Sequence, residues 1–449
     1  RSTDFEVHRN WLAITHSLPI KKWYVEDTSE WTLDYPPLFA WFEWLMSQVA
    51  FFVDPDMLQV SNLNYASDAT VIFQRVSVIL TDFVFYYAIN EWSLTDSDIH
   101  FQYNGILFGI MLLSIVRILQ DRPLEGAFWF SVLLNMKHIY MYIAPPYFVY
   151  LLRTYCFKIS FFLSISQRHN NFDPTKNTTS LNMFCFTSQH QLGQVMSRLF
   201  PFKRGLVHAY WAPNVWALYN GADKFLTILG LRMGFLQADA IPAASMTGGM
   251  VQEYSHVVLP SIAPLVTLIL TALGMLPALY MLWELKSPTA FVRSIILCAF
   301  TSFLFGWHVH EKAILMIIIP LTLLVKHTRE DARLFLLLSL TGYYSLFPLL
   351  FTPFVICPPP SAPILARCLG MLRLPLLSDL EGGYLWGLAA LRFFNDGILL
   401  RMLGIDLLTR LPFLPLMLTS TYCAVGVIYC WLRFYRYFLW VEGSSEEAL

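Results

Sequence analysis

Long apolar runs alternate with short polar segments along most of the chain. Three of the longest runs cover 256–283, 291–305 and 313–325. The first is long enough to cross a bilayer alone, because a spanning α-helix needs about 20 residues. The runs are continuous and lack the weak alternation, in segments of roughly ten residues, of a transmembrane β-barrel. The pattern predicts an all-α polytopic membrane protein with about ten to twelve spans.

Composition supports this class. Hydrophobic residues make up 56% of the 449 positions and charged residues only 14%, whereas soluble domains carry about 25% charged residues. The net charge of −1 gives no basic surplus that would indicate nucleic acid as a partner. The seven cysteines are scattered, mostly in apolar runs, without metal-type spacing or a paired framework. We expect them to be small buried side chains.

The polar segments divide the chain into four parts. Residues 1–37 form a polar opening loop, 38–166 a first set of spans, 167–205 a polar loop, and 206–449 a second set of spans. The polar loop contains a glycosylation sequon at Asn177, which works only on the lumenal side. No internal repeat is evident, which weighs against a transporter built from duplicated halves.

One tip between spans can be assigned a side. Short basic loops prefer the cytoplasm, and basic residues flank the far ends of the spans on both sides of the tip at 307–312. These residues are Lys286, Arg293, Lys326, Arg329 and Arg333. The tip itself is therefore predicted to face the lumen or the exterior.

The opening loop concentrates carboxylates and aromatic rings. Carboxylates accept protons from hydroxyl groups and aromatic faces cover sugar rings, so the loop has the chemical parts of a carbohydrate site. The chain begins at Arg1 without a Met, and we expect a further span before it. The carboxylates and aromatic residues are Asp4, Glu6, Asp27, Glu30, Asp34, Trp11, Trp23, Tyr24, Trp31 and Tyr35.

Asp4 and Asp34 are the leading candidates for chemistry. A carboxylate at the bilayer edge can act as general base for an acceptor hydroxyl, and a second carboxylate can orient that hydroxyl. Each has a structural alternative. Asp4 lies in a segment that resembles a helix start, with capping-box spacing from Thr3 to Glu6, and Asp34 could cap the span that starts at Leu38.

A second group lies at the tip, at His308, His310, Glu311 and Lys312. Two histidines at i and i+2 do not share a helix face, and no HExxH motif accompanies them, so a metal site is disfavoured. Lys is a compact cation for phosphate, and anion binding is the better interpretation. The alternative is a charged tip at the headgroups. Lys203 and Arg204 are a further phosphate candidate, with a basic flank of a span as the alternative.

Ionisable residues also occur in or beside the apolar runs. Such groups are costly in a membrane and usually face a bundle interior or a wet cavity. Snorkelling at a span end is the alternative, most of all for Arg117 and Lys137. The residues concerned are Glu43, Arg75, Asp82, Arg117, Lys137 and Asp396.

Several motifs stand in the order found in a known family. The chain resembles the endoplasmic-reticulum glucosyltransferases that use dolichyl phosphate glucose, within the GT-C superfamily. Residues 1–15 and 208–220 resemble the branch that adds the second glucose. The motifs are DFE at 4–6, RNW at 9–11, LPI at 18–20, WY at 23–24, LDYPP at 33–37, HFQYNG at 100–105, FPFKRG at 200–205 and HEK at 310–312.

The resemblance implies a GT-C-type bundle in the endoplasmic reticulum membrane with a lumenal site in the first loop. It implies dolichyl phosphate glucose as donor and a dolichyl-pyrophosphate oligosaccharide carrying one glucose as acceptor. Transfer would make an α-1,3 linkage by an inverting single displacement, without metal or cofactor. A first-glucose transferase, a transferase using a mannosyl lipid, and a lipid or sugar transporter are the alternatives.

The resemblance also implies roles for particular residues. Asp4 would be the base and Asp34 its partner, while His310 and Lys312 would meet the donor phosphate. Substrate-binding roles would fall to Glu6, Arg9, Trp11, Tyr35, His100, Gln102, Arg204, His310, Glu311 and Lys312. The family has a further span before the HFQYNG motif, where this chain has only about a dozen polar residues. We therefore expect one span to be missing near 90–100.

Overall fold

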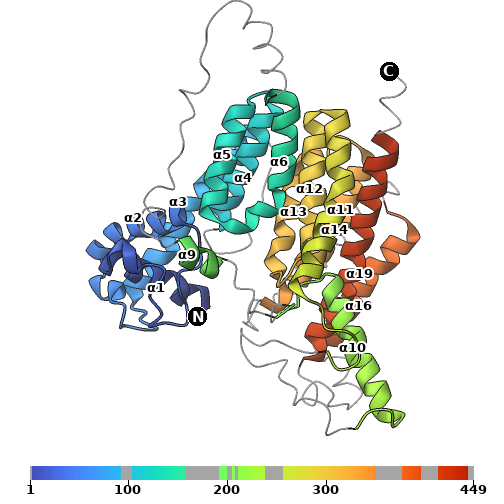
Figure 1. The fold of residues 1–449 in the computed structure, drawn as a ribbon, viewed down its shortest axis with the longest axis horizontal. Helices are drawn as coiled ribbons and strands as arrows, with labels where there is room; N and C mark the ends of the chain where they lie inside the picture. Colours follow the sequence, from blue (N-terminus) through green and yellow to red (C-terminus); the bar gives the residue numbers. More distant parts are fainter. Residues whose placement is uncertain are drawn as a thin grey trace, which may run out of the picture. The chain divides into compact units, whose positions relative to one another are not determined.

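A computed structural model gives the structure of the chain. It separates into two units, at residues 1–201 and 202–449, and each is described here by itself. Figure 1 shows its helices. The structure describes residues 3–92, 104–156, 192–199, 205–207, 211–237, 256–349, 377–395 and 413–442.

Unit 1 begins with two helices that pack against each other. Helix α1 covers Thr3–Ser17 and α2 covers Pro37–Val53, with the short 3-10 helices η1 (Ile20–Lys22) and η2 (Pro55–Leu58) after them. Pro37 stands at the first position of α2, where a residue without an N–H costs no hydrogen bond. The predicted helix start at the double proline is confirmed.

The rest of unit 1 is a layered helical stack. Helix α3 (Asp68–Trp92) packs on α4 (Asn104–Leu119), and α4 packs on α5 (Pro123–Met136). The 3-10 helix η3 (His138–Ile143), α6 (Ala144–Leu151), the π-helical turn η4 (Leu152–Cys156) and α9 (Leu192–Leu199) complete the unit. The Ser114 hydroxyl donates to the carbonyl of Gly126 at 2.7 Å and also contacts the Tyr147 hydroxyl, so one side chain joins α4, α5 and α6.

Unit 2 is organised around α12 (Pro288–Phe305), which is buried over nearly its whole length. Helix α11 (Pro264–Leu285) packs on it, as do α13 (Leu315–Leu321) and α19 (Leu414–Arg436). The other elements are α10 (Val215–Arg232), η7 (Glu311–Ile314), η8 (Thr322–Leu324), α14 (Arg329–Ser345), η9 (Phe347–Leu349), α16 (Asp379–Asn395) and η11 (Tyr437–Glu442).

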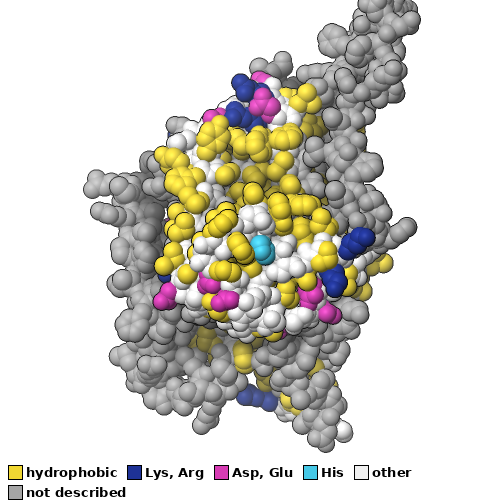
Figure 2. Space-filling model, turned by 90° about the vertical axis from the view of Figure 1, so that its left-hand side faces the viewer, with side chains coloured by type: hydrophobic (Ala, Val, Ile, Leu, Met, Phe, Trp, Pro, Cys, Tyr) yellow, Lys and Arg dark blue, Asp and Glu magenta, His cyan; other side chains and the backbone are white. Residues whose placement is uncertain are grey.

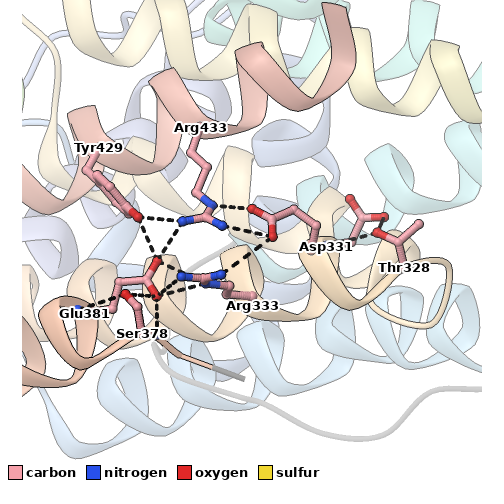
Figure 3. A network of polar contacts seen from close by, with 8 residues as sticks. Thr328, Asp331, Arg333, Ser378, Glu381, Tyr429 and Arg433 are labelled. Atoms are coloured by element: carbon pink, nitrogen blue, oxygen red, sulfur yellow. Dashed lines mark hydrogen bonds and ion pairs between the residues drawn. The ribbon is translucent and has the colours of Figure 1, made fainter. Parts of the chain in front are cut away.

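An ionic network joins α14, α16 and α19 (Figure 3). The Glu381 carboxylate accepts hydrogen bonds from Arg333, Tyr429, Ser378 and Arg433. Each of the three helices thus contributes to one charge cluster, in which Glu330 of α14 also pairs with Arg433 and Arg333.

Two apolar runs differ from their predicted extent. The run at 256–283 becomes helical only at Pro264, where a proline at the first helical turn begins α11. The run at 313–325 is divided into η7, α13 and η8, with Pro320 inside α13. Pro320 has no backbone N–H to donate, and α13 ends one residue after it, whereas α11 continues through Pro277.

Four described helices are long and apolar enough to cross a membrane: Asp68–Glu91, Pro264–Leu285, Pro288–Phe305 and Leu414–Trp440. Much of the surface of α2, α3 and α11 is apolar and exposed. Figure 2 shows hydrophobic side chains gathered on the face of unit 1, with most charged side chains toward its edges. An all-α membrane protein is thereby confirmed as the fold class.

Candidate functional site

Asp4 lies in the first turn of α1 and is half-buried. Acidic residues at this end of a helix are favoured by its dipole. Asp34 lies in the loop before α2. The cap of that helix is Pro36, and no side chain makes a cap hydrogen bond there. Asp34 is therefore not the cap residue of α2, contrary to the structural alternative.

Tyr35 and Lys137 bring the two aspartates into one cluster. Burial raises the pKa of the Tyr35 hydroxyl, and the charges of Asp34, Asp4 and Glu43 raise it further. The ammonium of Lys137 lies 4.8 Å from the centre of the Tyr35 ring. Both Asp34 and Asp4 thus act electrostatically on the same ring, although 30 residues separate them in sequence.

Lys137 is a site residue that the sequence analysis left without a role. It follows the last residue of α5 and donates from Nζ to Oδ1 of Asn104 at 3.2 Å. Burial lowers the pKa of Lys137 to about 8, and the carboxylates of Asp34 and Asp4 oppose that shift. Its position in an apolar run was the available signal.

Aromatic rings hold the loop carrying Asp34 against α1. The Tyr35 ring lies 4.9 Å from that of Trp11 and 4.8 Å from that of Phe39, centre to centre. The indole N–H of Trp11 donates to the carbonyls of Trp31 and Thr32, at 3.3 and 3.1 Å. Trp11 is only 3% exposed, so it packs inside the unit, and its direct contact with substrate stays a prediction.

Glu6 and Arg9 join α1 to the segment after α2. The Arg9 guanidinium donates to Glu6, with a shortest distance of 2.6 Å, and to the carbonyls of Met57 and Gln59, both at 3.1 Å. Arg9 is fully buried and Glu6 nearly so. These contacts stabilise the fold around the aspartates, and substrate binding by either residue stays a prediction.

His8 of α1 pairs with the buried Glu43 of α2. His8 lies one helical turn after Asp4 on α1, so the two share a helix face. Its Nδ1 lies 2.8 Å from Oε1 of Glu43, whose side chain is fully buried in α2. This burial supports the prediction that Glu43 faces the interior of the helical bundle.

The predicted tip of unit 2 lies between α12 and α13. Helix α12 ends at Phe305 with Gly306 as its C-cap, and η7 begins at Glu311 with His310 as its N-cap. The His310 Nδ1 accepts from the backbone N–H of Lys312 at 3.1 Å and lies 3.3 Å from Oε1 of Glu311. His310 is partly exposed, whereas Glu311 is buried.

His308 anchors this tip to residues 205–207. Its Nδ1 lies 2.8 Å from the carbonyl oxygen of Gly205, and because a carbonyl only accepts, Nδ1 carries the proton. Its backbone N–H donates to the carbonyl of Leu206, and Val207 forms a parallel bridge with Val309. These bonds stabilise the left-handed backbone of His308, whose φ is 52°.

The remaining predicted residues are not covered. His100, Gln102, Arg204 and the sequon at Asn177 lie outside the residues that the structure describes. Within the part that is described, no group of three His, Cys, Asp or Glu side chains is placed to hold a metal ion.

Apolar helices of spanning length, and two carboxylates that both act on the Tyr35 hydroxyl beside the half-buried Lys137, fit a membrane protein that acts on sugars. Comparison with known proteins supports this class. The family model described as "ALG6, ALG8 glycosyltransferase family" matches residues 1–434. The chain belongs to this family, and it is a glycosyltransferase.

Similar proteins share most of the chain. A mouse protein is 48% identical over 488 residues, covering 97% of this chain and 91% of its own. It is named dolichyl pyrophosphate Glc1Man9GlcNAc2 alpha-1,3-glucosyltransferase, as is a Schizosaccharomyces pombe protein that is 40% identical over 97% of this chain and 94% of its own. A Drosophila melanogaster protein, 48% identical over 99% of this chain and 92% of its own, has the same name preceded by "probable".

The alignment with the mouse protein is longer than this chain, which has 449 residues. It therefore includes positions at which the mouse protein has residues and this chain has none. The alignment length does not locate these positions, and the missing span near 90–100 stays a prediction.

Proposed function

We propose that this chain transfers glucose from dolichyl phosphate glucose, in α-1,3 linkage, to the monoglucosylated oligosaccharide Glc1Man9GlcNAc2 on dolichyl pyrophosphate. The observation that carries the proposal is the identity of 48% over 97% of the chain with a protein named for this linkage and this acceptor. The action of both Asp4 and Asp34 on Tyr35 supports the proposal, because it indicates two carboxylates near one another for the acceptor hydroxyl.

In the proposed reaction the Asp4 carboxylate takes the proton of the acceptor hydroxyl. The acceptor oxygen bonds to the anomeric carbon of the glucose, the bond from that carbon to the phosphate oxygen breaks, and dolichyl phosphate leaves with the electron pair. A β-linked donor then gives an α-linked product. Dolichyl phosphate is a good leaving group, so positioning and charge stabilisation supply most of the rate.

We propose roles for the other predicted residues as well. Asp34 orients the acceptor hydroxyl beside Asp4, and the Tyr35 side chain lines the site near both carboxylates. His310 and Lys312 are proposed to meet the donor phosphate, and Glu311 to bind substrate. His100, Gln102 and Arg204 are proposed to bind substrate. Trp11 is proposed to act through the loop carrying Asp34, and Glu6 and Arg9 through the segment after α2.

We further propose that the protein lies in the endoplasmic reticulum membrane with this site on the lumenal side. The donor and the acceptor are both lipid-linked, so each presents its sugar at a bilayer surface. The tip at 307–312 falls on the same side by the distribution of basic residues around it.

The test is a transfer assay with the purified chain and dolichyl phosphate glucose. It offers two acceptors, the unglucosylated and the monoglucosylated dolichyl-pyrophosphate oligosaccharide. We expect product from the monoglucosylated acceptor only. Product from the unglucosylated acceptor alone would make the chain a first-glucose enzyme, and preference for a mannosyl donor would also overturn the proposal. Lipid movement in proteoliposomes without sugar transfer would indicate a transporter.

A further inference from the structure

Arg198 of α9 joins two points of the opening loop in unit 1. Its guanidinium donates from Nε to the carbonyl of Tyr24 at 3.3 Å, and from Nη1 to the hydroxyl of Thr32 at 3.0 Å. Gln194, one helical turn earlier, donates to the same carbonyl of Tyr24 at 3.2 Å. Arg198 follows Thr32 by 166 positions in the sequence. A side chain far along the chain therefore connects two residues of the opening loop.

The part of the loop between these two residues is mostly exposed. Tyr24 is 1% exposed and Thr32 is half-buried, whereas most of residues 25–31 are exposed. Segments with few buried contacts open more easily than packed ones. The hydrogen bonds of Arg198 therefore stabilise the loop at both ends of its exposed part.

These hydrogen bonds reach the backbone on both sides of Asp34. Two residues before it, the hydroxyl of Thr32 accepts directly from Arg198. One residue after it, the carbonyl of Tyr35 accepts from the hydroxyl of Tyr24 at 2.7 Å, and the carbonyl of Tyr24 accepts from Arg198. Burial and the charge of Asp34 raise the pKa of the Tyr24 hydroxyl, which therefore stays protonated and remains a donor. Asp34 is thus flanked by two residues that are both connected to one guanidinium.

We propose that Arg198 is a positioning residue of the transfer site, which holds Asp34 in place through Thr32 on one side and through Tyr24 on the other. A guanidinium carries several donors in one plane, so a single side chain can bind both acceptors. Positioning of this kind matters because a misplacement of about 1 Å can lower a rate by about 100-fold. The inference rests on the proposed function, since it assumes that Asp34 orients the acceptor hydroxyl.

The first test measures glucose transfer in Arg198→Met and Arg198→Lys. The Met variant should lower kcat by about 10- to 100-fold and change KM for the donor by less than about threefold, because it displaces Asp34 and leaves donor binding intact. Lys has no planar fork and can bind only one of the two acceptors well, so its kcat should lie between those of wild type and Arg198→Met. The matched control is Arg122→Met, since the Arg122 side chain is 57% exposed in the same unit.

Two outcomes of this assay would overturn the inference. The first is a wild-type kcat in Arg198→Met. The second is a loss confined to KM for the donor, which would make Arg198 a ligand of the substrate phosphate.

A double-mutant cycle distinguishes positioning of Asp34 from a general loss of structure. If Arg198 acts through Asp34, then Arg198→Met should lower kcat by less than about threefold in a protein that already carries Asp34→Asn. A loss as large as in the wild-type background would show that Arg198 acts elsewhere, and the inference would fail.

The same cycle separates this inference from the proposed function. If Asp34→Asn lowers kcat and Arg198→Met does not, only the role of Arg198 fails. If Asp34→Asn transfers glucose at the wild-type rate, the proposed role of Asp34 fails instead.

Hydrogen exchange followed by mass spectrometry tests the contact without turnover. Arg198→Met should speed amide exchange in residues 24–35 by about fivefold or more, because it frees both ends of the exposed part of the loop. Tyr24→Phe should speed exchange mainly in residues 33–35, since it removes only the hydrogen bond to Tyr35. Exchange in α5 should stay as in wild type in both variants. Unchanged exchange in the loop of Arg198→Met would contradict the proposed positioning role.

Discussion

The Nδ1 atom of His8 lies 2.8 Å from Oε1 of Glu43, and this contact joins α1 to α2. The Glu43 side chain is fully buried, and its second oxygen, Oε2, has no hydrogen-bond partner among the residues that the structure describes. The pair lies between the start of α1, which carries Asp4, and the start of α2, which follows Asp34. It therefore contributes to the spacing of the two aspartates.

Removing either member of this pair should destabilise the protein. His8→Ala and Glu43→Ala are each expected to cost about 1–3 kcal/mol, because each removes the hydrogen bond between α1 and α2, and His8→Ala also takes this bond from a buried carboxylate. A double-mutant cycle by chemical unfolding should give a coupling energy of more than about 0.5 kcal/mol. The longer contact between Ser47 and His16, at 3.4 Å, is the control pair and should couple more weakly. Equal coupling in both cycles would contradict this account.

Asp54 should make stability depend on acid pH. Partial burial raises the pKa of its carboxyl, but hydrogen bonds from Ser67, Thr70 and Tyr65 outweigh burial and hold the pKa below its ordinary value. A lowered folded pKa stabilises the protein above the unfolded value, near pH 4, and this contribution is lost as pH falls. Asp54→Asn should cost about 1–3 kcal/mol at pH 7.

Unfolding curves of wild type and Asp54→Asn from pH 7 to 3 test this directly. The gap between the two proteins should narrow as pH falls. A gap that is constant across the whole range would show that the carboxylate charge does not contribute.

Helices α3 and α4 approach closely at Gly109. A Cβ there would come within 2.7 Å of the backbone of Phe85, which cannot rotate away. Gly109→Ala should therefore push the helices apart and cost about 1–3 kcal/mol. Gly383→Ala in α16 meets nothing within 4 Å and should stabilise by about 0.5–1 kcal/mol through helix propensity. Unfolding midpoints that shift in the same direction for both would refute the packing argument.

A buried ion pair stabilises unit 2. Arg293 of α12 donates to both oxygens of Asp331, at 2.7 and 3.0 Å, and Thr328 donates to the same carboxylate. Asp331→Asn leaves a buried guanidinium without its counter-charge and should cost about 3–5 kcal/mol. The exposed Asp379 provides the control, and Asp379→Asn should cost less than about 1 kcal/mol. Thermal unfolding of the two variants in detergent compares them.

Hydrophobic patterning predicted the class of fold and several of its helices. The double proline at 36–37 marked the start of α2, and the run at 291–305 is nearly the whole of α12. The run at 313–325 was predicted as one span, because hydrophobicity alone does not show that it is divided into η7, α13 and η8 around Pro320.

The candidate site was predicted only in part. The opening loop displayed Asp4 and Asp34 directly, but their grouping with Lys137 depends on how α5 ends against α4 and the loop. Local sequence does not encode that contact. The pairing of His8 with Glu43 likewise joins residues 35 positions apart. Neither His8 nor Glu43 belongs to a motif that identifies the other, so their contact is evident only from the packing of α1 on α2.

The central claim is that Asp4 is the general base of glucose transfer. The most direct test compares wild type with Asp4→Asn, which keeps the size of the side chain but cannot accept the proton. With dolichyl phosphate glucose and the monoglucosylated acceptor, we expect kcat to fall by about 100-fold or more, while membrane insertion and unfolding stability remain as in wild type. Transfer by Asp4→Asn at the wild-type rate would contradict the account.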